Sequence, residues 1–424
     1  MKTVPERFDM AREPVRTRWF LKPITKLLSF PDMIVHRPEI RFHGTKGLKP
    51  PYLLLCNHNA FMDFKVATQV IFPHSANYVV AIDGFIGREW LLRNVGCICK
   101  RKFTNDATLV RQLKRVIENK SIAVVYPEAR YSLCGTTAVL PSSLGKLCKM
   151  LDVPVATLIC HGHHVNSPFW NTTHDRKVHT EADFTLLFTR KGLQHRTPEQ
   201  INKAIVDAFQ YDDFQWQAQK SVYIKYPRRA EGLHKVLYQC PACGTEYKMT
   251  SRGVLLKCNH CGKTWKLTQI GELNAQGGQE TEFAHVPDWY EWERANVRKE
   301  IEAGTYSSGD LPVHVDSLPN SKGYIRLGNG TMRHDMDGFH VYGTDVDGDL
   351  FDKRWEVPSL YSVHIEYEYL GKFGDCVDLN TLEDTWYVYP ENQDFSVTKM
   401  ALATEELYYA YRRRIGKPCE EGLA

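Results

Sequence analysis

The chain has 424 residues, more than one ordinary hydrophobic core accommodates, so two or three domains are expected. A hydrophobic content of 43% and a charged content of 25% exclude an intrinsically disordered protein. The formal net charge of +4 is too small to indicate nucleic-acid binding, and we expect none.

No apolar run approaches the roughly 20 residues that a membrane-spanning helix needs. The first residues, MKTVPERFDMAREP, lack the apolar segment of a secretory signal. The 12 cysteines comprise two close pairs and eight scattered residues, a pattern typical of reduced thiols with one metal site. We therefore expect a cytoplasmic protein.

Residues 1–44 are expected to form an N-terminal amphipathic segment, because RTRWFLKPITKLLSF mixes apolar with basic side chains. The apolar ones are Trp19, Phe20, Leu21, Ile24, Leu27, Leu28 and Phe30, and the basic ones are Arg16, Arg18, Lys22 and Lys26. Such a face can lie on a membrane. A helix packed on its own domain is the alternative, and we favour a peripheral position at the inner face of the membrane.

From residue 45 to residue 215, short apolar segments alternate with helical ones. Asp106–Lys120 and Ser142–Leu151 have the spacing of helices. This alternation predicts an α/β domain with a mostly parallel sheet flanked by helices. The predicted strands are Tyr52–Cys56, Tyr78–Ile82, Val95–Cys99, Ile122–Tyr126, Val153–Cys160 and Phe184–Thr189.

The stretch LLLCNHNAFMDF places His58 and Asp63 just beyond an apolar strand, where reactive side chains of α/β sheets collect. Acyl transfer to an alcohol needs a base that works near neutral pH, and histidine fits. A carboxylate can fix the tautomer of the ring, and Asp63 can do so if the turn folds back. Taken alone, this pair is also compatible with a core histidine beside a helix start.

Further polar residues follow later strands. VGCICKRK runs into three consecutive basic residues, and YPEARYS places Glu128 and Arg130 beyond another strand. Basic residues gathered at strand ends could hold a phosphate.

In order and spacing, these segments resemble the motifs of the phospholipid/glycerol acyltransferase superfamily, which includes the lysophosphatidate acyltransferases. Its Asn-His and Asp motif appears as Asn57, His58 and Asp63. Its Gly-x-Ile strand with a basic residue resembles residues 96–98 with Arg101 or Lys102. Its Phe-Pro-Glu-Gly-x-Arg-Ser motif is similar to residues 126–132, and its Val-Pro motif to residues 153–154. The resemblance covers about residues 45–190.

The resemblance implies acyl transfer from acyl-CoA or an acyl carrier protein to a hydroxyl of a lysophospholipid or glycerol-phosphate-type acceptor. His58 would be the general base, and Asp63 would orient it. The acceptor would be bound by Asn57, Arg101, Lys102, Glu128 and Arg130. No cofactor is needed for this catalysis.

The sequence departs from the family pattern at three places. Ala60 replaces a serine, Ala129 replaces a glycine, and Arg130 stands one position before the usual arginine, where Tyr131 is found. These changes leave His58 and Asp63 untouched, but they weaken the inference that the acceptor is glycerol phosphate or lysophosphatidate.

Three histidines, His161, His163 and His164, lie close together after a predicted strand. Because no further ligand stands at a suitable spacing, we interpret them as a polar loop beside the active site and not as a zinc site.

Residues 237–268 contain Cys240 and Cys243, followed after 14 residues by Cys258 and Cys261. Two Cys-x2-Cys pairs at this spacing are typical of a tetrahedral Zn²⁺ site. The segment resembles a zinc ribbon, whose folding would depend on its structural metal ion. A structural or protein-contact role is favoured over nucleic-acid binding.

Residues 269–322 are predicted to be a linker with one helix, WYEWERANVRKEIEA, capped by Asp288. Residues 323–424 show short strands and then a helix, Thr404–Arg413, which favours a β-barrel-like domain capped by a helix. In this order the region resembles a pleckstrin-homology-like domain.

A second reading remains open, in which the chain is a non-catalytic zinc-ribbon scaffold or a nucleic-acid-binding protein with a degenerate acyltransferase domain. The intact Asn57, His58 and Asp63 set argues against it. A serine hydrolase is disfavoured because the chain has no Gly-x-Ser-x-Gly segment.

Overall fold

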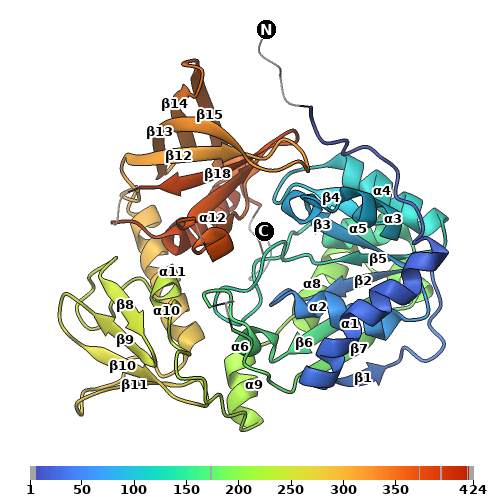
Figure 1. Ribbon diagram of the computed structural model, residues 1–424, viewed down its shortest axis with the longest axis horizontal. Coiled ribbons are helices and arrows are strands. Elements are labelled where there is room, and N and C mark those ends of the chain that lie inside the picture. Colours follow the sequence, from blue (N-terminus) through green and yellow to red (C-terminus); the bar gives the residue numbers. More distant parts are fainter. Residues whose placement is uncertain (1–5, 172–173, 372, 392–393, 418, 420–424) are drawn as a thin grey trace.

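The computed structural model describes every residue except 1–5, 172–173, 372, 392–393, 418 and 420–424, and it leaves the side chains of Ile24, Thr25 and Leu28 outside the description. Its strands form three sheets that occupy different parts of the molecule (Figure 1). The first sheet lies within residues 39–188, the second within residues 249–275, and the third within residues 311–390.

The first sheet has the strand order β1-β7-β6-β2-β5-β3-β4. All neighbouring strands are parallel except β6 and β7, so the prediction of a mostly parallel sheet is confirmed. The edge strand β1 precedes residue 45, where we expected the α/β domain to begin. The strands are β1 (Glu39–His43), β2 (Tyr52–Cys56), β3 (Ala76–Ala81), β4 (Ile98–Lys100), β5 (Ile122–Val125), β6 (Val155–His161) and β7 (Glu181–Phe188).

Both faces of this sheet are covered, as expected for fully buried strands. Leu54 and Cys56 of β2 pack on the side of α2 (Met62–Ile71), and α1 (Lys22–His36) lies against α2. Leu53 and Leu55 point to the other side. That side is covered by α4 (Ala107–Glu118), α5 (Leu144–Leu151), α7 (Arg190–Gln194) and α8 (Pro198–Ala208).

The strand predicted at Val95–Cys99 is shorter and shifted. Val95 is the last residue of α3 (Glu89–Val95), and Gly96 ends this helix with φ +91°. Gly96 adopts the left-handed conformation that commonly ends helices. The strand therefore begins after this glycine, as β4, and pairs with β3.

The remaining short helices lie in connections. They are α6 (His163–Asn166), α9 (Asp213–Gln219) and α10 (Leu233–Val236), together with the 3-10 turns η1 (Trp19–Leu21), η2 (Ile82–Phe85), η3 (Val357–Ser359) and η4 (Tyr369–Gly371).

The second sheet is a small antiparallel meander in the order β11-β10-β9-β8. Its strands are β8 (Met249–Arg252), β9 (Leu255–Cys258), β10 (Thr264–Leu267) and β11 (Leu273–Ala275). The helix α11 (Val286–Glu302) follows it. This helix begins before Asp288, so the predicted cap was wrong. Pro287 lies in the first turn, where its missing N–H is not needed.

The third sheet is antiparallel throughout, in the order β15-β14-β13-β12-β18-β17-β16, and it curls (Figure 1). Its strands are β12 (Leu311–Ser317), β13 (Ile325–Asp335), β14 (Gly338–Asp345), β15 (Leu350–Glu356), β16 (His364–Glu366), β17 (Cys376–Asn380) and β18 (Thr385–Pro390). The final helix α12 (Val397–Arg414) lies against β16 and α11, and it begins seven residues before the predicted start.

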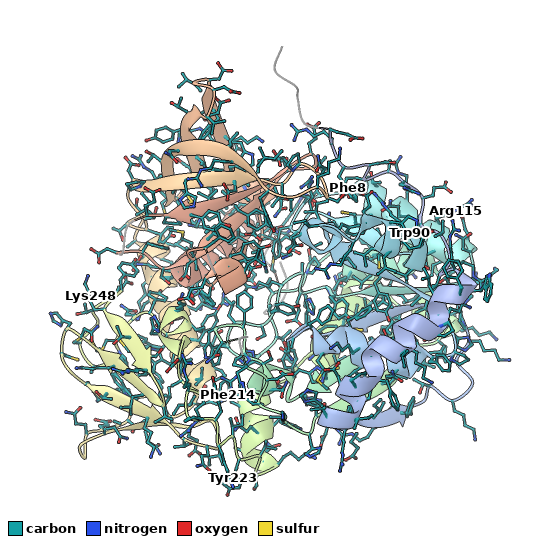
Figure 2. The ribbon with its side chains drawn as sticks, viewed as in Figure 1. Phe8, Trp90, Arg115, Phe214, Tyr223 and Lys248 are labelled. Atoms are coloured by element: carbon teal, nitrogen blue, oxygen red, sulfur yellow. The ribbon has the colours of Figure 1, made fainter. Side chains whose placement is uncertain are left out.

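The N-terminal segment joins the first sheet to the third. Figure 2 shows Phe8 where the third sheet approaches the first. Its N–H donates to the carbonyl of Pro319 at 3.0 Å, and its ring packs edge-on against Phe85. Among the helices that the structure describes, none has the length and hydropathy needed to cross a bilayer.

Candidate active site

The turn between β2 and α2 folds back on itself, as the candidate catalytic pair requires. The Oδ2 atom of Asp63 accepts the N–H groups of Asn59 at 2.6 Å and Ala60 at 3.0 Å. The same oxygen lies 3.3 Å from Nδ1 of His58. Asp63 is buried with 1% of its surface exposed, whereas the His58 side chain is 23% exposed. The Asp63 carboxylate therefore contacts Nδ1 of His58 and leaves Nε2 for other partners.

Sequence reasoning did not assign a role to His163, which contacts the other oxygen of Asp63. Its Nδ1 hydrogen-bonds Oδ1 of Asp63, and the ring is fully buried at the start of α6. Burial by itself would raise the pKa of Asp63, but the hydrogen bonds from His163 and His58 hold that pKa at about 2. Asp63 is therefore a carboxylate at neutral pH, shared by two histidines.

Two tyrosines flank the ring of His58. The ring centroids of Tyr126 and Tyr131 each lie 4.4 Å from that of His58. Glu128, in the same loop, accepts the backbone N–H of His58 at 2.9 Å. These contacts fix both the ring and the backbone of His58.

His58 lies on the wall of a cavity of about 780 Å³. Most of the cavity wall is apolar, and it includes Phe61, Phe64, Tyr78, Leu109, Leu147 and Met150. A smaller cavity of about 190 Å³ shares Phe61, Phe64 and Tyr78 with it and extends to Lys26 and Phe72 beside α1. The histidine thus faces a space that suits an apolar chain.

Two of the predicted acceptor-binding residues have other partners. The Arg101 guanidinium is 1% exposed and donates to the carbonyls of Leu318, Pro319 and Glu383 and to Oγ1 of Thr385, at 2.7–3.0 Å. Arg101 therefore links the first sheet to the third. Because these contacts occupy its guanidinium group, we no longer assign Arg101 to the acceptor.

Arg130 borders the cavity, but its Nη2 atom donates to Oε1 of buried Glu405 on α12 at 2.7 Å. Arg294 of α11 donates to the other oxygen of Glu405 at 2.8 Å. Nη2 of Arg130 is thus paired, whereas its Nη1 atom is buried and has no hydrogen-bond partner among the described residues. The motif predicted a basic residue here but could not show that α12 covers it.

Asn57 and Glu128, two more of the predicted acceptor ligands, also form hydrogen bonds within the protein. The amide group of Asn57 donates to the carbonyl of Cys160 and accepts its N–H, both at 2.8 Å. Glu128 is fully buried and accepts N–H groups from His58 and Ala138. Burial raises the pKa of Glu128 to about 8, against these hydrogen bonds. Lys102, another of the predicted acceptor ligands, also lines the cavity. None of the contacts described above joins its side chain to another part of the protein.

The third sheet supplies part of the cavity wall, which no motif predicted. Tyr361, His364 and Glu366 lie in or just before β16 and face the same cavity as His58. The residues are about 300 positions apart in sequence, so only the fold brings them together.

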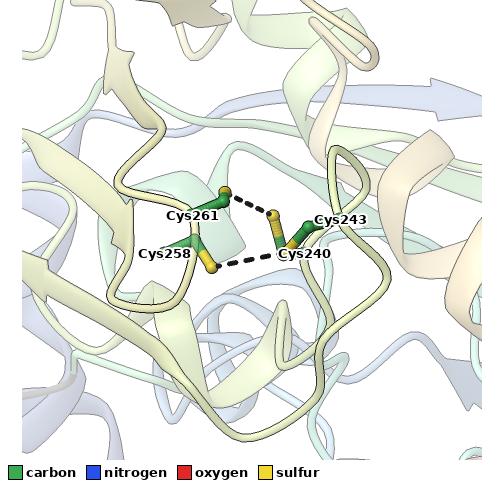
Figure 3. A group of neighbouring side chains, drawn as sticks. All are labelled: Cys240, Cys243, Cys258 and Cys261. Atoms are coloured by element: carbon green, nitrogen blue, oxygen red, sulfur yellow. Dashed lines mark hydrogen bonds between the residues drawn. The ribbon is translucent and has the colours of Figure 1, made fainter.

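The four predicted metal ligands meet at one point beside the second sheet (Figure 3). The Sγ atoms of Cys240 and Cys261 are 3.7 Å apart, and those of Cys243 and Cys258 are 3.8 Å apart. Four thiolates about 2.3 Å from a tetrahedral Zn²⁺ have sulfur–sulfur distances of about 3.8 Å. Each Cys pair ends in a turn closed by a glycine at positive φ, Gly244 or Gly262. The donor set therefore fits Zn²⁺.

Residues 39–161 match the family model described as acyltransferase. The resemblance to acyltransferases seen in the sequence motifs is thus confirmed for this part of the chain, which contains β1 to β6 of the first sheet.

No curated protein matches the chain in sequence. Among solved structures, the chain is similar to the 1-acyl-sn-glycerophosphate (LPA) acyltransferase PlsC from Thermotoga maritima, with 12% sequence identity and a TM-score of 0.34. The match covers 45% of this chain and 77% of that chain. A similarity of this size defines neither the site nor the substrate.

Proposed function

We propose that the chain transfers a fatty acyl group from a thioester of coenzyme A or of an acyl carrier protein to a hydroxyl group of a glycerolipid-type acceptor. The observation that supports this most directly is His58, which lines a largely apolar cavity while Asp63 holds its Nδ1 atom.

In this proposal, Nε2 of His58 accepts the proton of the acceptor hydroxyl as its oxygen attacks the thioester carbonyl. The C–O bond forms, and the tetrahedral intermediate then collapses with loss of the thiolate. The imidazolium returns the proton to the departing sulfur, so the histidine ends as it began. Asp63 stabilises the imidazolium and keeps the proton on Nδ1 in the resting state.

A direct test uses the purified chain with a radiolabelled acyl-CoA, in the presence and absence of a lysolipid, with the products separated by chromatography. We expect labelled product lipid that depends on the acceptor. Release of free fatty acid at the same rate without acceptor would instead define a thioesterase and contradict the proposal.

We further propose that η1 and α1 together hold the protein on a lipid surface. Trp19 is 82% exposed and Leu27 is 70% exposed, and Phe30 and Ile34 are also exposed. Lys22 and Lys26 of the same helix line the smaller cavity next to the catalytic one. An apolar face with basic neighbours at this position would bring a bilayer beside the cavity. The side chains of Ile24 and Leu28, which we also assigned to this face, lie outside the described residues.

Sedimentation with vesicles of phosphatidylglycerol and phosphatidylcholine tests this proposal. The double variant Leu27→Glu, Phe30→Glu should bind vesicles at least about tenfold more weakly, because each charge must leave water. Leu350→Glu is a matched control, since Leu350 is even more exposed than Leu27 and Phe30 but lies on β15. Equal binding by the double variant and the wild type would rule out this surface.

We also propose that Cys240, Cys243, Cys258 and Cys261 bind one structural Zn²⁺. The fit of the sulfur distances supports this, and the ion would stabilise a small sheet with little core of its own.

A further inference from the structure

The part of the cavity wall that comes from the third sheet is acidic. His364 Nε2 lies 2.8 Å from Oε1 of Glu366, and Asp378 on the adjacent strand β17 stands behind them, with Oδ2 3.8 Å from the same nitrogen. Asp83 lines the cavity from η2. The third sheet therefore brings two carboxyl groups to the catalytic cavity or directly behind it, and η2 brings a third.

Lys102 is the cation that acts on all three of the third-sheet side chains, and Arg130 also influences His364. Lys102 lines the cavity, and its charge influences Glu366, Asp378 and His364. Of the other two basic residues that the motifs suggested, Arg101 binds backbone carbonyls, and Arg130 is paired with Glu405 through Nη2. Lys100, which donates to Thr104, and Lys146 of α5 also line the cavity. The cation that acts on Glu366 and Asp378 is Lys102.

Two polar atoms of this wall are buried and have no hydrogen-bond partner among the described residues. They are Nδ1 of His364 and Oδ2 of Asp378, in side chains that are 3% and 2% exposed. Unsatisfied polar atoms are rare in folded proteins, and His364 lines the cavity, so a polar group of a bound molecule would give its Nδ1 atom a partner. Burial raises the pKa of Glu366 to about 7, against the charge of Lys102, so this carboxyl group can both donate and accept hydrogen bonds at neutral pH.

We propose that the third sheet forms the head-group wall of the acceptor site, and that His364, Glu366 and Lys102 select an uncharged polyol head group over a phosphomonoester. A phosphomonoester carries a charge of about −1.5 to −2 at neutral pH, and the ionised forms of the carboxyl groups at this wall would repel it. Hydroxyl groups can bond to a carboxyl, an imidazole and an ammonium group together. This inference rests on the proposed function, since it concerns the acceptor of that reaction.

The test compares a matched pair of soluble acceptors, 1-hexanoylglycerol and 1-hexanoylglycerol 3-phosphate, which differ only in the phosphate. Binding is measured by calorimetry on the full-length His58→Ala protein, so that no reaction interferes. We expect the uncharged acceptor to bind at least about tenfold more tightly. Glu366→Lys should reverse this preference, because it replaces a carboxyl group with a second cation. The isosteric Glu366→Gln should weaken the discrimination while the protein stays folded by circular dichroism.

Glu356→Gln, on the exposed edge strand β15, is the control and should bind both acceptors as the parent does. Equal or tighter binding of the phosphate compound, binding of neither compound, or an unchanged preference in both Glu366 variants would overturn the inference. Turnover by the wild-type chain separates the two proposals. Selective binding without acyl transfer would refute the proposed function, whereas transfer that favours the phosphate compound would refute only the inference.

Discussion

The two oxygens of Asp63 have different partners, and this difference defines the proposed base. One oxygen closes the turn after β2 and contacts His58, while the other contacts His163. The second contact keeps the buried carboxylate in place on a side that His58 does not reach. His163 is thus a positioning residue, because it acts on His58 only through Asp63.

We predict that His163→Phe lowers kcat by about tenfold or more with little change in KM, because Asp63 loses a hydrogen bond that keeps it oriented and ionised. His163→Asn should retain most of the activity, since its amide N–H can replace that of Nδ1. The measurement is steady-state kinetics of acyl transfer. Equal kinetics in the two variants would show that His163 only fills space.

For single residues, sequence reasoning succeeded where the two side chains in contact are close together in the chain. His58 and Asp63 lie five residues apart, so a motif and the chemistry of a turn were enough to expect their contact if the turn folds back. His163 lies 100 residues from Asp63, and its three-histidine loop was only placed near the site. Arg101 and Arg130 were assigned to the acceptor because their motifs give no information on the segments that cover them.

At the scale of elements, the boundaries that sequence reasoning missed are those set by packing. The first residues of α12 are almost all buried between α11 and the third sheet, so tertiary contacts extend the helix to Val397. The strand β2 was predicted with its observed ends, because an unbroken apolar run between polar turns suits only a central strand.

The start of α11 is held by an ion pair that depends on pH. His285 Nε2 lies 3.0 Å from Asp212, and Nδ1 lies 3.1 Å from Asp288. The contact with the Asp212 carboxylate is the main cause that raises the pKa of His285 to about 9, while partial burial opposes it. Because the pKa is raised on folding, the stabilisation is complete below pH 6.5 and disappears as the pH rises through 9.

We therefore predict that His285→Gln lowers the free energy of unfolding by about 1 kcal/mol at pH 6, after allowance for solvent screening of a partly exposed pair, and by much less at pH 9.5. Urea denaturation followed by tryptophan fluorescence measures the difference. His195→Gln, at an exposed position after α7, serves as control. A loss that is the same at both pH values would contradict the ionic account.

At the scale of the whole molecule, the acyltransferase domain does not form its cavity alone. The third sheet supplies His364 and Glu366, and the contacts of Arg101 fix that sheet against the first one. The family resemblance covered under half of the chain, so the contribution of the rest could not be inferred from motifs. The second sheet lies apart from His58 and, in our proposal, depends on its metal ion.

We predict that the purified chain contains about one Zn²⁺, measured by mass spectrometry of the metal, and that chelation increases amide hydrogen exchange in residues 240–267 far more than in β2 and β5. Cys258→Ser should reproduce the effect of the chelator, because the remaining three thiolates hold the ion less tightly. Cys148→Ser, at a buried cysteine of α5 outside this cluster, should leave the metal content unchanged. Protein without metal but with full protection of residues 240–267 would contradict the prediction.

The most direct measurement for the account is kcat/KM for acyl transfer by His58→Ala. Loss of a general base predicts a decrease of about 10² to 10⁴ relative to the wild type, with an unchanged circular dichroism spectrum, while exposed His195→Ala stays within about twofold. If His58→Ala transferred acyl groups as fast as the His195→Ala control, this imidazole would not be the base, and the proposed mechanism would be wrong.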